Sequence, residues 1–131
     1  MPRLTSGRRM GTCNKYRGSF PASVSPTSRD LEWAAGFLEG EGCFKANNNR
    51  CEIIEASQVN PEPLGKLLVL FGGRVRHKPQ PTATSNDFWV WVVSGPRARG
   101  IMLTLYPLLS VKRQQQVEIA LLSNVPVRID S

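Results

Sequence analysis

Two glutamates, Glu39 and Glu41, stand among small residues in the stretch AAGFLEGEG, residues 34–42. Apolar residues recur at helical spacing before them, so both acids are expected near the end of a helix. The carboxyl end of a helix already carries partial negative charge, and further acids are unfavourable there unless something positive is bound. Unpaired carbonyls and a carboxylate are the oxygen ligands that Mg²⁺ accepts. From spacing alone, however, two solvated residues at a helix end are the simpler interpretation.

The signals around this stretch define the helix. Ser28 can cap its amino end, and Asp30 lies in the first turn, where acids are favoured. Gly42 is a suitable stop at the carboxyl end. Gly36 and Gly40 lie four residues apart and therefore share one face. This face lacks side chains and would permit another backbone to approach closely.

The rest of the chain alternates between strand and helix patterns, with turn residues between them. The predicted elements after Gly42 are strands 43–47 and 50–59, a helix over 63–71, strands 74–78 and 88–93, and helices 96–109 and 111–124, the first of these kinked or interrupted by Pro107. This order predicts an α+β domain in which helices cover one face of an antiparallel sheet.

The motif AAGFLEGEG followed by a hairpin resembles the LAGLIDADG homing endonucleases, DNA-cutting enzymes spread by mobile introns and inteins. The resemblance covers residues 30–124 and includes the order of elements, which matches the αββαββα core of that family. Residues 107–115, PLLSVKRQQ, look like the family's C-terminal segment with a catalytic lysine, and Ser57 with Gln58 is a weaker match. The resemblance implies a curved, four-stranded antiparallel sheet with helices on one face. The sequence departs from the commonest pattern of the family in three ways: both acids are Glu, Ala34 stands where the family has its leading Leu, and only one copy of the motif is present.

The resemblance also implies roles for individual residues. Glu41 would be the acid that binds a divalent metal, Mg²⁺, with the carbonyl of Gly40 beside it, whereas Glu39 would hold the local structure of the motif. Lys112 would stabilise charge at the phosphate or polarise water, and Gln58 would orient the attacking water.

Several of these roles have simpler alternatives. Lys112 could be a solvated residue near a helix amino end, where a cation is slightly unfavourable. Arg113 beside it is a second candidate for the same catalytic role.

A single motif implies a homodimer. One carboxylate per chain is a sparse site for Mg²⁺, and two copies related by a twofold axis would supply two acids. In the family, the two motif helices cross at their small residues. The corresponding interface residues here are Ala35, Gly36 and Gly40, although ordinary packing of small residues at a helix end would explain them as well.

The predicted sheet offers a surface for DNA. Residues 74–78 read RVRHK, so alternate residues form a basic stripe on one face and His77 lies on the other. A β-ribbon fits the major groove, and Arg can bond guanine edges. The candidate DNA contacts are Lys45, Asn47, Arg50, Arg74, Arg76 and Lys78. In the strand 88–93 the sequence leaves open whether the face with the two tryptophans or the opposite face meets DNA.

Composition agrees with a polyanionic partner. The 131 residues carry a formal net charge of +7, from 17 Lys and Arg against 10 Asp and Glu. Residues 1–29 hold six bases and no acid, so the remainder has eleven bases against ten acids. We expect residues 1–27 to form a basic, flexible tail and residues 28–131 a single domain. A transit peptide or an arm that follows phosphates are the alternatives for the tail.

Two further features of the sequence indicate in which cellular environment the protein is expected. No apolar run approaches the ~20 residues of a membrane helix, so no membrane partner is expected. The three cysteines are odd in number and widely spaced, which favours free thiols in a reducing intracellular compartment over a disulfide framework or a zinc site. The sequence does not identify that compartment.

The sequence therefore supports three hypotheses about function. The first is a homodimeric, Mg²⁺-dependent endonuclease that cuts double-stranded DNA at specific sites. The second is a binder of the same fold that does not cut, such as a maturase acting on intron RNA or a DNA-binding regulator. The third is an unrelated basic interaction module, which would be a monomer insensitive to divalent ions.

Overall fold

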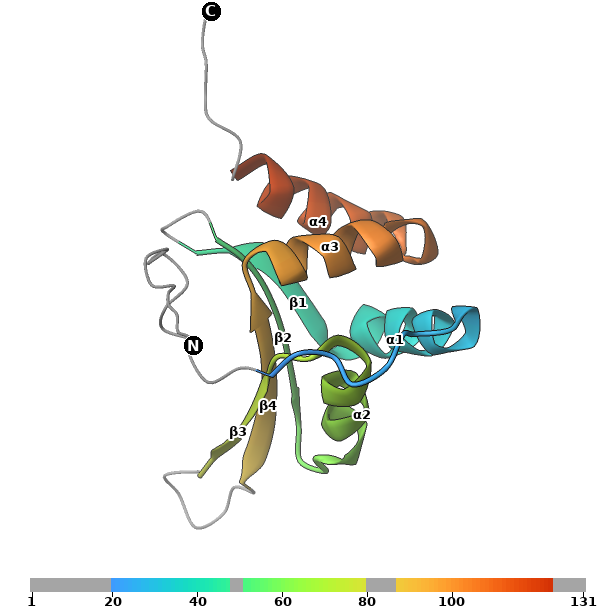
Figure 1. Cartoon of the computed structure of the whole chain (residues 1–131). Helices are drawn as coiled ribbons and strands as arrows, with labels where there is room; N and C mark the ends of the chain where they lie inside the picture. Colours follow the sequence, from blue (N-terminus) through green and yellow to red (C-terminus); the bar gives the residue numbers. More distant parts are fainter. Residues whose placement is uncertain (1–19, 48–50, 80–86, 124–131) are drawn as a thin grey trace, which may run out of the picture.

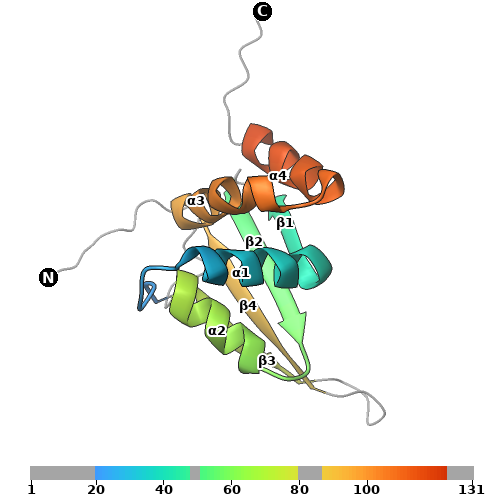
Figure 2. The same ribbon diagram turned by 90° about the vertical axis from the view of Figure 1, so that its right-hand side faces the viewer.

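The computed structural model describes residues 20–47, 51–79 and 87–123 (Figure 1). Its elements are α1 (Ser28–Glu41), β1 (Gly42–Ala46), β2 (Glu52–Gln58), α2 (Glu62–Phe71), β3 (Arg74–Lys78), β4 (Phe88–Ser94), α3 (Pro96–Leu105), a 3₁₀ turn η2 (Tyr106–Leu108) and α4 (Val111–Ser123). The strands form one sheet in the order β1-β2-β4-β3, and every neighbouring pair is antiparallel. Figure 2 shows α1, α2 and α3 in front of the sheet. The predicted α+β class and the order of elements are confirmed.

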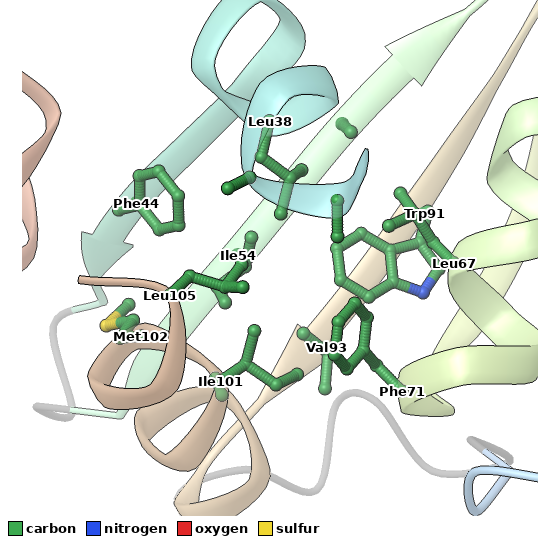
Figure 3. Close-up of a cluster of buried hydrophobic side chains, with 14 of the residues drawn as sticks. Leu38, Phe44, Ile54, Leu67, Phe71, Trp91, Val93, Ile101, Met102 and Leu105 are labelled. Carbon is green, nitrogen blue, oxygen red and sulfur yellow. The ribbon is translucent and has the colours of Figure 1, made fainter. Parts of the chain in front are cut away.

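The core lies between the sheet and the helices. Leu38 of α1, Ile54 of β2 and Trp91 of β4 are fully or almost fully buried and belong to one cluster (Figure 3). The Trp91 ring meets Phe71 of α2, and its Nε1–H donates to the Gly72 carbonyl at 2.9 Å, so its only polar atom is paired. The face of β4 that carries the two tryptophans therefore faces the helices, which the sequence left open.

The opposite side of the sheet, called here the outer face, follows from strand alternation and register. On this face, Glu55 of β2 lies beside Val92 of β4, and Val92 lies beside Arg74 of β3. In the next row of the same face, Ser57 lies beside Val90, and Val90 lies beside Arg76. The centre of this face is apolar, because Ile53, Val90 and Val92 form a second, smaller cluster of buried side chains. Its basic residues therefore belong to the two edge strands, β1 and β3.

The start of α1 differs by one residue from the prediction. Thr27, not Ser28, is the capping residue: its side chain accepts a hydrogen bond from Asp30 N at 3.1 Å, and Asp30 Oδ2 accepts one from Thr27 N at 2.9 Å. Gly42 does end the helix, but in an extended conformation with φ −88°. Glycine is needed there because an added Cβ would lie 2.8 Å from the Leu38 carbonyl oxygen.

The chain joins the domain earlier than expected. Phe20 and Gly73 exchange two backbone hydrogen bonds, of 2.7 and 2.8 Å, and Ser23 N donates to the Val69 carbonyl at 2.8 Å. Residues 20–27, predicted as part of a flexible tail, are thus held against α2 and the start of β3. The rest of the predicted tail, residues 1–19, lies outside the described residues.

Two other sequence-based expectations concern the environment. Cys43 is a free, exposed cysteine, whereas Cys51 is disulfide-bonded. The expectation of three free thiols is wrong for Cys51, and the argument for a reducing compartment loses its support. Over the described ranges, no helix combines the length and hydrophobicity needed to cross a membrane.

Candidate active site

The carboxyl end of α1 meets the amino end of α4. Glu39 Oε1 accepts a hydrogen bond from Ser110 N at 2.9 Å, and Glu39 Oε2 accepts one from Ser110 Oγ at 2.5 Å. Ser110 immediately precedes α4, where backbone N–H groups lack helical partners and the helix dipole is positive. The negative charge that is unfavourable at the end of α1 is therefore compensated by the start of another helix.

Arg113 strengthens the same junction, which we call the α1–α4 junction and define as Glu39, Ser110 and Arg113. Its Nε–H donates to the Glu39 carbonyl oxygen at 2.9 Å, and its NH1 donates to Gln116 Oε1 at 2.8 Å. Lys112 lies between Ser110 and Arg113 in the sequence, and its side chain is exposed. Among the described residues, its ammonium group forms no hydrogen bond or ion pair. Of the two cations considered from sequence, Arg113 is thus hydrogen-bonded to Glu39, whereas the Lys112 side chain is exposed.

The electrostatics of the junction favour ionised Glu39. The hydrogen bond from the Ser110 side chain, then that from the Ser110 backbone, holds the pKa of the Glu39 carboxyl below its ordinary value. The charges of Arg113 and Lys112 act in the same direction.

This lowered pKa predicts how stability depends on pH. Because the folded chain has the lower pKa, ionised Glu39 stabilises the fold above the ordinary carboxyl range, and this contribution is lost as the pH falls through that range toward the folded pKa. Between about pH 6 and pH 3, the wild type should lose more free energy of unfolding than Glu39→Gln, measured by urea denaturation. Glu32→Gln, a change at an exposed position of the same helix, should follow the wild type.

Glu41 and Gln58 lie at this end of the sheet as well. Glu41 is the last residue of α1 and is exposed, and the residue after it, Gly42, pairs with Ala56 of β2. Gln58 lies two residues beyond Ala56, so it ends β2 beside the end of α1. Its register partner Trp89 packs against the core, which places Gln58 on the helix-covered side of the sheet and Ser57 on the outer face.

A metal would find only part of a site in one chain. Within the described ranges, no group of three or more His, Cys, Asp and Glu side chains could hold a metal ion. Glu41 is the exposed carboxylate at the end of α1, and a helix end offers carbonyl oxygens beside it. These donors suit a hard cation, but they complete a site only with ligands from elsewhere.

The predicted DNA contacts divide into groups. Arg74, Arg76 and Lys78 alternate along β3 and share the outer face, and Lys45 of β1 forms an ion pair with Glu55 at 3.1 Å. Glu55 was missed from sequence because a strand pattern does not identify cross-strand partners.

The other residues of the predicted strands considered above are Asn47, Arg50 and His77. Asn47 Oδ1 accepts a hydrogen bond from Cys51 N at 3.0 Å, so this side chain closes the hairpin, and Arg50 lies outside the described residues. His77 contacts Asp87 at 3.0 Å and the Trp89 ring at 4.8 Å, away from the basic stripe as expected.

The three residues proposed for the dimer interface differ in how exposed they are in the single chain. Gly36 and Gly40 are exposed, and an added Cβ at either would have nothing within 4 Å. Ala35 is 3% exposed and packs in the core of its own chain, and its place in a dimer interface stays a prediction. Beside the glycines, the Trp33 and Phe37 rings stack with centroids 5.4 Å apart.

Comparison with known proteins gives a match in structure only. No protein-family model and no curated protein sequence matches the chain. Two solved structures of the homing endonuclease I-CvuI are similar, one bound to the I-CreI target with Mg and the DNA not cleaved, the other bound to its own target with Ca. They give TM-scores of 0.54 and 0.52 at 20% and 19% identity, over 72% of this chain. The match spans 64% of the length of each I-CvuI chain. At this identity the likeness establishes the fold, which is that of the LAGLIDADG homing endonucleases, as the motif at residues 34–42 suggests.

Proposed function

We propose that this protein is a site-specific endonuclease for double-stranded DNA that acts as a homodimer with Mg²⁺. The observation that carries the proposal is the α1–α4 junction. There, Glu39 and Ser110, separated by 71 positions, are hydrogen-bonded to each other, next to Glu41 on one side and Lys112 on the other. An acid at a helix end and an exposed lysine are the residue types that phosphodiester hydrolysis requires.

Each residue has a defined task in this proposal. Glu41, with the Gly40 carbonyl, would hold Mg²⁺, and the second copy of the chain would supply the second carboxylate. The bound ion would supply Lewis-acid charge at the phosphate and make water more acidic. Lys112 stabilises negative charge that develops on the phosphate, and Gln58 accepts or donates a hydrogen bond to orient the attacking water.

DNA would lie along the outer face of the sheet. The basic edge strand β3 would contact phosphates or guanine edges through Arg74, Arg76 and Lys78, and Lys45 would act at the opposite edge. Neighbouring strands are spaced about 4.8 Å apart, so the two edges of a four-stranded sheet lie roughly 14 Å apart. That separation is close to the roughly 12 Å width of the major groove.

If DNA lies along the outer face, removal of a positive charge from β3 should lower the affinity for DNA and reduce the dependence of that affinity on salt concentration. Arg76→Gln should weaken DNA binding about tenfold at physiological salt. If Arg76 contacts a phosphate, the slope of log K against log salt should also fall by about one unit. The measurement is fluorescence anisotropy with a duplex over a range of KCl concentrations in Ca²⁺. Arg29→Gln, an equal charge change at the exposed start of α1, should bind like the wild type, and equal losses in both variants would contradict the placement.

A binder of the same fold that does not cut is the second candidate, such as an intron RNA maturase or a DNA-binding regulator. The basic outer face would serve this activity equally well, for DNA or for intron RNA.

One experiment separates the candidates. The full chain is incubated with a randomised duplex library and Mg²⁺, and the ends of any cut products are sequenced. Recurrent ends around a common, roughly palindromic site support the endonuclease. Tight binding to DNA or RNA without cut ends supports the second candidate. A monomer that binds neither nucleic acid nor divalent ions supports the unrelated interaction module.

A further inference from the structure

One acid lies on the outer face of the sheet, among residues expected to meet DNA. Glu55 belongs to β2, an interior strand, and on this face it lies between Cys43 of β1 and Val92 of β4. The structure describes β2 and β4 in full, and Glu55 is the one charged side chain that these two strands place on the outer face, with Ser57 and Ser94 as the other polar ones. A carboxylate that faces phosphates is repelled by them, so this position lowers the affinity for DNA unless the carboxylate is compensated or bonds to the DNA.

Glu55 is accessible on this face, whereas its apolar neighbours are not. Ile53, Val90 and Val92 are buried, but 31% of the Glu55 side-chain surface is exposed. Phosphates bound the major groove on both sides and base edges form its floor. Side chains of interior strands therefore face base edges when a sheet lies in this groove, and those of edge strands can reach phosphates. The position of Glu55 thus suits a base contact.

Lys45 holds the Glu55 carboxylate from the edge strand β1. Its Nζ lies 3.1 Å from Glu55 Oε1, and its side chain is 47% exposed. In register, Lys45 lies beside Ile53, two residues along β2 from Glu55, so the ion pair runs diagonally between the two strands. A pair as exposed as this one contributes little to stability. It does fix a hydrogen-bond donor beside an acceptor on the outer face.

The two side chains together match the major-groove edge of one kind of base pair. An ionised carboxylate only accepts hydrogen bonds, and an ammonium group only donates them. A G·C pair places the guanine O6 acceptor next to the cytosine N4 donor, and guanine adds N7 as a second acceptor. In an A·T pair, the acceptor next to the adenine N6 donor is thymine O4, which has the thymine methyl group beside it. The Lys45–Glu55 pair is therefore better matched to G·C.

We propose that Glu55 is a specificity-determining residue that accepts a hydrogen bond from the N4 amino group of a cytosine, while Lys45 donates to the guanine of the same base pair. The inference rests on the proposed function, because it requires DNA along the outer face. It adds a base preference, which is one C·G pair at a fixed position in each half of the site. Cleavage is not needed to observe this preference, because a bound complex already shows it.

The first test is selection by binding. The full chain is equilibrated with a randomised duplex library in Ca²⁺, and the bound duplexes are sequenced for the wild type, Glu55→Gln and Glu32→Gln. The wild type and Glu32→Gln, which changes an exposed acid of α1, should select the same C·G pair. Glu55→Gln should select adenine in place of that cytosine, because a glutamine amide can bond both N6 and N7 of adenine. Preferences at the other positions should be unchanged.

Affinities for single duplexes give the size of the effect. Replacing the selected C·G pair by A·T should weaken binding of the wild type about tenfold, and that of Glu55→Gln by less than about threefold. Lys45→Met should lose discrimination at this base pair and not at others. Both variants should unfold near the wild-type urea concentration, since the ion pair is half exposed. A change in affinity that is equal for all sequences would therefore not come from misfolding.

The outcomes separate this inference from the proposed function. If Glu55→Gln keeps the base preferences of the wild type, or changes the affinity for every duplex by the same factor, Glu55 does not read a base and the inference fails, while binding and cleavage of DNA stand. Selection of adenine by the wild type at the position that responds to Glu55→Gln also overturns the assignment to cytosine. A wild type that binds no duplex overturns the inference and the proposed function together.

Discussion

Glu41→Gln is expected to lower the rate of DNA cleavage by about a thousandfold or more, with DNA affinity changed by no more than about threefold. The substitution keeps the size of the side chain and removes the negative charge that would hold the cation at the end of α1. Glu41 is exposed and has no described partner in the fold, so its replacement should leave the free energy of unfolding within about 0.5 kcal/mol of wild type. Single-turnover cleavage in Mg²⁺, binding in Ca²⁺ and urea denaturation measure the three quantities.

Two matched variants make this result specific. Glu32→Gln changes the same residue type on the same helix and should cleave like the wild type. Glu39→Gln should lose only about tenfold, because both oxygens of the Glu39 carboxylate are already hydrogen-bonded to Ser110. If Glu41→Gln cleaves at the wild-type rate, or if Glu39→Gln is the more damaged of the two, then Glu41 is not the metal-binding acid.

The fold was predictable where local chemistry decides the structure. The alternation of RVRHK fixed β3 at residues 74–78, and the glycines at 72 and 73, with φ of +77° and +104°, fixed the end of α2. Pro107 lacks a backbone N–H and cannot continue an α-helix, so the last predicted turn of α3 became the 3₁₀ turn η2. These features depend on one residue or a short pattern, which a sequence displays directly.

Features that depend on tertiary contacts were not predictable in the same way. Thr27 and Ser28 are adjacent hydroxyl residues that can both cap a helix, and only the reciprocal bond from Asp30 decides between them. On β4, both faces are apolar, so alternation could not say which one the helices cover. The packing of Ala35 into its own core likewise depends on which side of α1 faces the sheet, and Gly36 next to it faces away.

The candidate site also combines features that the sequence displays directly with features that depend on tertiary contacts. The motif indicated Glu41 and Lys112 by residue type and order, but not that Ser110 joins their two segments. A serine just before a predicted helix suggests a cap, and a glutamate at a helix end suggests a missing cation, yet the two signals lie 71 positions apart. Only the fold brings them together, and it thereby explains an acid that is unfavourable in its own helix.

Replacing the two exposed glycines of α1 with alanine is expected to have opposite effects on two free energies. It should stabilise the folded monomer and weaken the dimer. In the single chain, Gly36 and Gly40 are exposed helical positions where a new Cβ meets nothing within 4 Å. Alanine should therefore stabilise the monomer by about 0.5–1 kcal/mol at each position, since it loses less backbone entropy on folding than glycine does. At a close helix–helix crossing, the same methyl groups would force the two backbones apart, at a cost of about 1–3 kcal/mol.

The double variant Gly36→Ala, Gly40→Ala should consequently unfold at higher urea concentration, when compared with wild type at concentrations where both are monomeric. It should also dimerise about a hundredfold more weakly in sedimentation equilibrium, and lose cleavage in proportion at low protein concentration, because each chain alone lacks the second Glu41. Gly65→Ala is the matched control, since Gly65 is an exposed glycine in α2 that also has nothing within 4 Å. It should stabilise the chain without changing the dimer. Unchanged association in the double variant would show that the dimer forms through another surface, and that the two Glu41 side chains are not brought together at α1.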